Sequence, residues 1–126
     1  MREILFRGKL LYSEKWIFGD LIKKGEPSDK EYVIADDNVE GHWTFGIQAE
    51  TVGQFTGITD RDGAKIFEGD IIRVSCGKIT GTGTVEFRDG MFGIEWGWHK
   101  DFTGFRDFAN PLFEVIGNIY DEEVEK

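Results

Sequence analysis

Cysteine, histidine and proline are all scarce in this chain of 126 residues, which contains one Cys, two His and two Pro. Cys76 has no second cysteine with which to form an intramolecular disulfide, as is usual in a reducing compartment. Cys76, His42 and His99 lie too far apart in the sequence for the spacing of a zinc site, and no nearby acid marks a Cys-His nucleophile pair. We therefore expect an ordinary thiol and two ordinary imidazoles.

Long apolar runs are also missing. No run approaches the roughly 20 apolar residues that a membrane-spanning helix needs. Residues 1–7 contain neither the apolar segment nor the small-residue cleavage site of a secretion signal. We expect a cytoplasmic protein that does not act at a membrane.

Positive charge is in short supply, because 15 Lys and Arg stand against 24 Asp and Glu, a formal net charge of −9. The chain ends in an acidic tail, residues 121–126. A negative field repels phosphate groups, so binding of nucleic acid by the whole surface is disfavoured. Basic protein surfaces or metal ions are better partners, although such a charge also serves solubility alone.

Aromatic residues and glycine are abundant, with 11 Phe and 17 Gly. Strands joined by tight turns have this composition, and no segment of ten or more residues shows the period of an amphipathic helix. We predict one mainly β domain over residues 1–126, with little helix, built as a small bent sheet or a partly open barrel of short antiparallel strands. The expected strands are residues 3–6, 15–22, 32–35, 51–55, 67–74 after an initial turn, 81–87, 91–96 and 113–120.

One hairpin is indicated strongly by local chemistry. Asp89-Gly90 stands between residues 85–87 and 91–96, two runs of apolar and β-prone residues. Asp-Gly is typical of two-residue hairpin turns because both positions require a positive φ. Residues 42–45, flanked by glycines, are either a loop tip or an edge strand.

Four blocks, in order along the chain, carry a family likeness. They are residues 2–7, residues 52–72, the hairpin of residues 85–94, and residues 113–121. Together they resemble the YopX family of small proteins carried by phages and prophages. Residues 23–46 and 97–111 fall outside the matching blocks. The resemblance implies a mainly β fold with barrel character and a cytoplasmic place in the host cell. It implies no known biochemical activity and supplies no catalytic residues.

An acidic cluster is the first candidate for chemistry: Asp60, Asp62, Glu68 and Asp70. Carboxylates held together can bind a divalent metal and activate water, as in a hydrolase. The segment around Gly63 is similar to an EF-hand loop, but the register then places Ile58 and Gly69 at ligand positions that need oxygen side chains. Turn chemistry is the competing interpretation, since Asp side chains accept backbone N–H groups in turns.

Residues 96–108 are the most distinctive stretch because basic residues lie among several aromatic residues there. The candidate interaction surface is Trp96, Trp98, His99, Phe102, Phe105, Arg106 and Phe108. The rings either fill the domain's own core, anchor a protein partner or stack nucleic-acid bases. The acidic neighbours of the two basic residues argue against the last of these.

These observations favour a protein that is not an enzyme and needs no cofactor or metal. The leading hypothesis is an accessory protein that acts through contacts with a host or phage protein, or through self-association as a homo-oligomer. The alternative is a nucleic-acid-related role, as a single-strand binder or as an acidic DNA mimic that inhibits a host enzyme. A metal-dependent hydrolase built on the acidic cluster is the third hypothesis.

Overall fold

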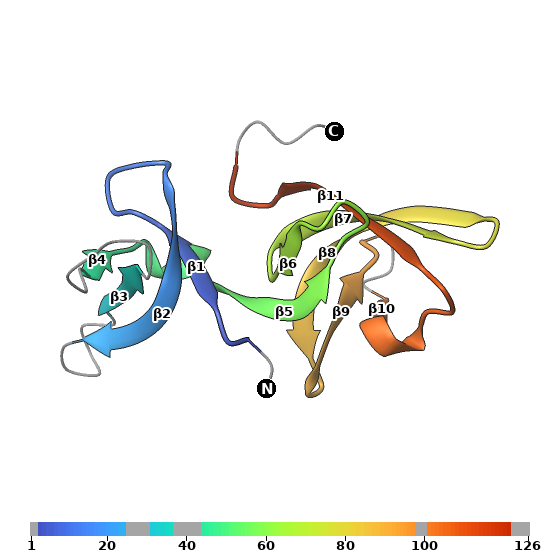
Figure 1. Cartoon of the computed structure of the whole chain (residues 1–126), viewed down its shortest axis with the longest axis horizontal. Helices are drawn as coiled ribbons and strands as arrows, with labels where there is room; N and C mark the ends of the chain where they lie inside the picture. Colours follow the sequence, from blue (N-terminus) through green and yellow to red (C-terminus); the bar gives the residue numbers. More distant parts are fainter. Residues whose placement is uncertain (1–2, 25–30, 37–43, 98–100, 122–126) are drawn as a thin grey trace. The chain divides into compact units, whose positions relative to one another are not determined.

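The computed structural model describes residues 3–24, 31–36, 44–97 and 101–121 (Figure 1). Antiparallel strands dominate these residues, with two short 3-10 turns, so the prediction of a mainly β protein is confirmed. The strands are β1 (Phe6–Lys9), β2 (Trp16–Lys24), β3 (Glu31–Asp36), β4 (Thr44–Gly46), β5 (Gly53–Thr59), β6 (Lys65–Phe67), β7 (Asp70–Cys76), β8 (Ile79–Arg88), β9 (Met91–Glu95), β10 (Phe102–Gly104) and β11 (Leu112–Asn118). The 3-10 turns are η1 (Ala49–Thr51) and η2 (Phe105–Asp107).

Two compact units make up the chain, Met1–Phe55 and Thr56–Lys126. Strand β5 runs from the first unit into the second, where its far end pairs with β6. No composition shift or linker at this point announces the division in the sequence. The expectation of a single domain stays a prediction.

The first unit is a sheet in the order β4-β3-β2-β1-β5, and one face carries its apolar core. Ile17, Ile34 and Ile47 are buried there. The other face of β1 carries two cations, Arg7 and Lys9, which are 7% and 2% exposed. The Lys9 ammonium pairs with Glu14 at 2.5 Å, and both cations lie near the ring of Trp16, at 4.6 and 5.5 Å from its centre.

These buried cations explain an error in the sequence interpretation. A strand is expected at residues 3–6, but the observed strand β1 begins at Phe6 and continues to Lys9. Arg-Gly-Lys has no apolar alternation, and the contacts that bury it come from residues elsewhere in the chain. The pairing of β2 with β1 and β3 runs through Gly19 without a shift in register.

The second unit holds a sheet in the order β10-β9-β8-β7-β11. Its core is formed by apolar side chains from β6, β7, β8, β9, η2 and β11: Ile66, Ile72, Val74, Val85, Ile94, Phe105 and Phe113. Strands β7 and β8 form a long hairpin whose turn extends beyond β11 (Figure 1). Each described sheet has two ends in hydrogen-bonding order, so neither closes on itself as a barrel.

The predicted Asp-Gly hairpin is confirmed. Arg88 pairs with Met91 across the turn between β8 and β9. Asp89 and Gly90 have φ values of 54° and 82°, the left-handed geometry that both central residues of a type I′ turn require. The segment at residues 42–45 is settled in part, because Thr44–Gly46 form the edge strand β4, while His42 and Trp43 lie outside the described residues.

Candidate functional site

Asp60 fastens a turn to a strand. It is 8% exposed, and one carboxylate oxygen accepts the N–H groups of Asp62 and Ala64, each at 2.9 Å. The other oxygen accepts the N–H of Val115 in β11 at 3.0 Å. Burial raises the pKa of Asp60, but the backbone N–H groups that stabilise the carboxylate outweigh it, so the pKa lies below its ordinary value of 3.8.

The other acidic candidates do not join Asp60. Asp70 is 2% exposed and accepts the N–H of Phe67 at 2.7 Å, in the turn that precedes β7. Asp62 is exposed beside the first turn. Within residues 3–24, 31–36, 44–97 and 101–121, no three His, Cys, Asp or Glu side chains form a group that could hold a metal ion. The bonds of Asp60 and Asp70 agree with the turn interpretation.

The aromatic stretch divides between the core and a partly exposed position. Phe105 is buried in the core, and Trp96 and Phe108 pack against the same core. Their rings form an edge-to-face series, with centroids 6.0 Å apart for Trp96 and Phe108 and 5.6 Å apart for Phe108 and Phe113. Trp98 and His99 lie outside the described residues.

Phe102 and Arg106 occupy different surroundings. The guanidinium of Arg88 lies over the Phe102 ring, 4.9 Å from its centre. Arg88 also donates to Glu86 at 2.8 Å and Glu95 at 3.1 Å, and these bonds, led by the one to Glu86, raise its pKa above the ordinary value. Arg106 is exposed, at the rim of a shallow apolar hollow of about 280 Å³ that Ile58 and Phe92 also line.

A second hollow, which we call the hairpin pocket, is lined by Val74, Cys76, Ile79, Thr80, Gly81, Trp96, Asp101 and Phe108. Its volume is about 260 Å³. The end of the β7–β8 hairpin supplies one side, and Trp96 and Phe108 supply the other. Ile79 is 75% exposed beside the opening.

Three local features shape the hairpin pocket. Gly81 lets the Trp96 ring lie directly on β8, because a Cβ at position 81 would come within 3.0 Å of the ring carbon Cζ3. The indole N–H of Trp96 donates to the Thr103 hydroxyl at 2.9 Å, which fixes the plane of the ring. The Cys76 thiol donates to the carbonyl oxygen of Ala109 at 3.0 Å.

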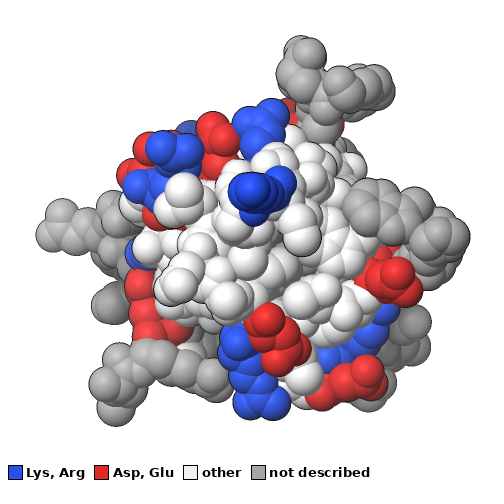
Figure 2. Space-filling model, turned by 90° about the vertical axis from the view of Figure 1, so that its right-hand side faces the viewer, with Lys and Arg blue, Asp and Glu red and all other residues white. Residues whose placement is uncertain are grey.

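Uncharged side chains gather on the face of the second unit toward which the hairpin points. Figure 2 shows them across the centre of this face, with basic side chains in its upper middle and both acidic and basic side chains around its border. Sequence reasoning pointed to Trp96 and Phe108 but missed Ile79, Gly81 and Asp101. Ile79 and Gly81 belong to β8, which precedes the aromatic stretch in the chain. No local sequence pattern indicates that they contact that stretch.

No helix among the described residues is long and apolar enough to cross a membrane.

The comparisons with known proteins place the chain in one family. No curated protein matches the chain. Residues 5–124 match the family described as YopX protein. That match covers nearly all of the 126 residues, so the chain belongs to the YopX family.

Proposed function

We propose that this chain is a non-enzymatic protein that acts by binding another protein, and that the hairpin pocket is the point of contact. The observation that carries the proposal is an open, largely apolar pocket lined by two aromatic rings and by Ile79, an isoleucine that is 75% exposed. Apolar and aromatic side chains that gather at a concave surface mark binding sites for partners more often than plain surface.

The size of the pocket indicates the kind of occupant. Small-molecule sites usually enclose roughly 300–1,000 Å³, and the hairpin pocket holds about 260 Å³ and is open to solvent. That space suits one side chain of a partner better than a whole cofactor or substrate. A protein interface commonly uses such a pocket to receive an anchor residue, whose burial supplies much of the binding energy.

The groups that could do chemistry already have structural roles. The carboxylates of Asp60 and Asp70 accept backbone N–H groups in turns. The Cys76 thiol donates to a backbone carbonyl. Groups engaged in this way support a binding role over a catalytic one.

The test uses one variant in the pocket and one matched to it elsewhere. Ile79→Lys places a positive charge at the pocket edge, and because the side chain is 75% exposed, the change should cost the fold less than about 0.5 kcal/mol. Leu112→Lys makes a comparable change at a residue that is 53% exposed and does not line the pocket.

We expect a bacterial extract to yield a protein that the unaltered chain and Leu112→Lys both retain and Ile79→Lys loses. Sedimentation of the purified chains over a concentration series separates a foreign partner from self-association. Equal retention by all three baits, together with identical sedimentation, would count decisively against the pocket as the point of contact.

The alternative function is mimicry of DNA by an acidic surface, which the net charge of −9 favours. Such a protein should have no affinity for single-stranded DNA but should inhibit a DNA-binding enzyme, with inhibition that falls as salt rises. Ile79→Lys and Leu112→Lys should change that inhibition equally, whereas only Ile79→Lys should abolish binding through the pocket. The same variant therefore separates the two functions.

A further inference from the structure

We infer that the hairpin pocket receives a lysine or arginine side chain from a basic partner. This inference rests on the proposed function and names the chemistry of the residue that the pocket takes. Three features carry it: an apolar channel that suits a methylene stem, an aromatic ring with a fixed plane, and one acidic side chain in the lining.

The apolar part of the pocket matches the stem of a long basic side chain. Val74, Gly81 and Phe108 line it together with the exposed Ile79. Lysine and arginine bury their methylene stems on apolar surface while their charged ends stay near water. An open pocket on the surface allows that arrangement, whereas a closed apolar cavity would not.

The polar part of the pocket favours a positive charge. Asp101 is the only charged residue among the described residues that line the pocket. Its side chain is exposed and forms no ion pair with another described residue. The Trp96 ring, which also lines the pocket, is held by its bond to Thr103, and an indole face attracts cations more strongly than other aromatic rings do.

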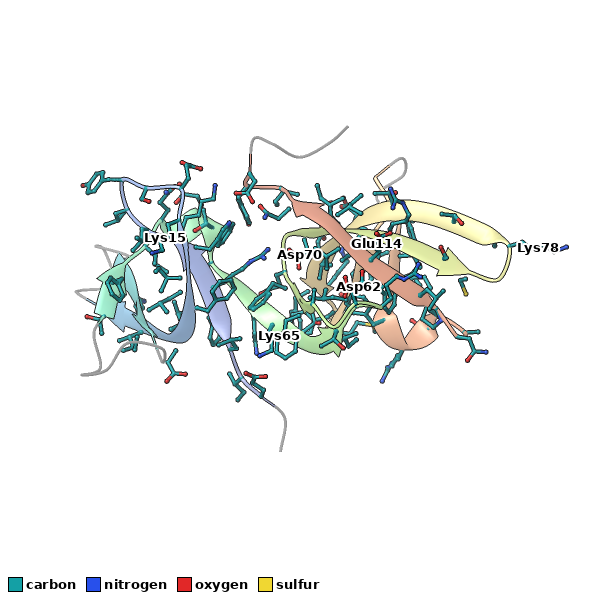
Figure 3. The ribbon with its side chains drawn as sticks, turned by 45° about the horizontal axis from the view of Figure 1, so that its top comes forward. Lys15, Asp62, Lys65, Asp70, Lys78 and Glu114 are labelled. Carbon is teal, nitrogen blue, oxygen red and sulfur yellow. The ribbon has the colours of Figure 1, made fainter. Side chains whose placement is uncertain are left out.

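The same chemistry already occurs elsewhere in the chain. Arg7 and Lys9 lie 4.6 and 5.5 Å from the centre of the Trp16 ring, and Arg88 lies 4.9 Å from that of Phe102. In each of these places a cation of the chain lies over an aromatic ring. Lys78, at the hairpin turn, points away from the body of the unit (Figure 3).

Long-range charge points to the same partner. The net charge of −9 attracts basic proteins and repels acidic ones. A partner steered to this surface by its positive charge presents lysine and arginine side chains first. The pocket therefore receives the residue type that the overall field brings to it.

Cys76 provides a direct readout of occupancy, since it lines the pocket and is the only cysteine in the chain. An occupant should slow its alkylation by the uncharged reagent N-ethylmaleimide. The probes are blocked five-residue peptides with glycine at every position except the centre, which is lysine, norleucine or glutamate. Norleucine keeps the methylene stem of lysine and lacks the charge, so the pair isolates the contribution of the cation.

We expect the lysine peptide to protect Cys76 at concentrations about two- to fivefold lower than the norleucine peptide, and the glutamate peptide to give no protection. Added salt should narrow the difference. A cation near a thiol favours the reactive thiolate, so protection by the lysine peptide cannot arise from its charge acting on the thiol alone.

Asp101→Asn should remove the preference for lysine and leave protection by norleucine unchanged. Asp107→Asn, which removes an exposed charge that does not line the pocket, should keep the preference. Equal protection by lysine and norleucine in the unaltered chain, or a preference that survives Asp101→Asn, overturns the cation inference but leaves the pocket as a binding site. Protection by none of the peptides up to solubility overturns the pocket itself and the proposed function with it.

Discussion

Removal of the Asp60 carboxylate should unfasten the turn between β5 and β6 from strand β11. Asp60→Ala leaves three backbone N–H groups, those of Asp62, Ala64 and Val115, without the acceptor that they have at 2.9 to 3.0 Å. Arg61 reinforces the same junction, because its N–H donates to the carbonyl oxygen of Phe113 at 2.9 Å. That bond would still join the turn to β11 in the variant.

The three bonds are not equal in value. Asp62 and Ala64 are exposed, so water replaces much of what their N–H groups lose. Val115 lies in the sheet, and a hydrogen bond to a charged acceptor there is worth about 1.5–3 kcal/mol. With about 0.5–1 kcal/mol for each of the two exposed donors, Asp60→Ala should lower the free energy of unfolding by about 2.5–5 kcal/mol, out of about 5–15 kcal/mol for a typical domain.

The pH dependence carries a second signature. Because folding lowers the pKa of Asp60 below 3.8, the carboxylate contributes its stability above the unfolded pKa and loses it as the pH falls through the folded pKa. The unaltered chain should therefore lose stability below about pH 4 more steeply than Asp60→Asn does. The sign follows from a depressed acid pKa, and a raised pKa would give the opposite trend.

Denaturant unfolding followed by tryptophan fluorescence measures both effects, since Trp96 lies in the same unit. Asp62→Ala removes a neighbouring exposed carboxylate and serves as the control, with an expected change within about 0.5 kcal/mol. A loss in Asp60→Ala no larger than that of Asp62→Ala, or equal pH profiles for Asp60→Asn and the unaltered chain, would refute the role given to this carboxylate.

Two further changes test how the second unit holds its aromatic residues. Trp96→Phe and Thr103→Val should each lower the free energy of unfolding. The double variant should show a coupling free energy of about 0.5–1.5 kcal/mol, because both single changes remove the same indole hydrogen bond. Additive effects would show that the bond contributes nothing. Gly69→Ala should lower the free energy of unfolding by about 1–3 kcal/mol, and thermal unfolding should show a larger loss than for Gly63→Ala. Both glycines have a positive φ, but of the two only position 69 would bring a Cβ against a ring, that of Tyr120, at 2.8 Å. Equal losses would contradict this packing.

Turn chemistry explains why much of the second unit was predictable. Asp89-Gly90 specifies a hairpin by itself, because the φ requirement is local. The alternation of small and β-branched residues around Val85 marks β8 in the same local way. Asp70 and one oxygen of Asp60 act within their own turns, so the turn interpretation needed no knowledge of distant residues. The bond of the other Asp60 oxygen to Val115 in β11 was not predicted.

Long-range contacts explain what the sequence did not predict. Strand β1 contains Arg7 and Lys9, which look like surface residues until Trp16 and Glu14 are placed beside them. Strand β10 has only three residues, Phe102–Gly104, too few to show a period. The division into two units could not be predicted, because the boundary lies within one continuous strand, β5.

Two rings of the candidate surface belong to both the core and the hairpin pocket. Core and interface were the alternatives for Trp96 and Phe108, and each ring packs against the core and also lines the pocket. An interface role for these rings stays a prediction. A sequence pattern cannot show that division, because it depends on Gly81 leaving room for the indole. A bulkier residue at position 81 would move Trp96 off β8 and alter the pocket while the rest of the core stayed in place.

The blocks that make the family recognisable and the residues that form the pocket overlap little, and this has a physical reason. Turn residues such as Asp60 and Gly69 permit few substitutions, since their geometry allows only certain side chains. The side chain of Asp101, exposed and outside the described strands, is not under that constraint, so what it contributes is charge. If the pocket selects its partner, exchange of Asp101 should change the partner without changing the fold.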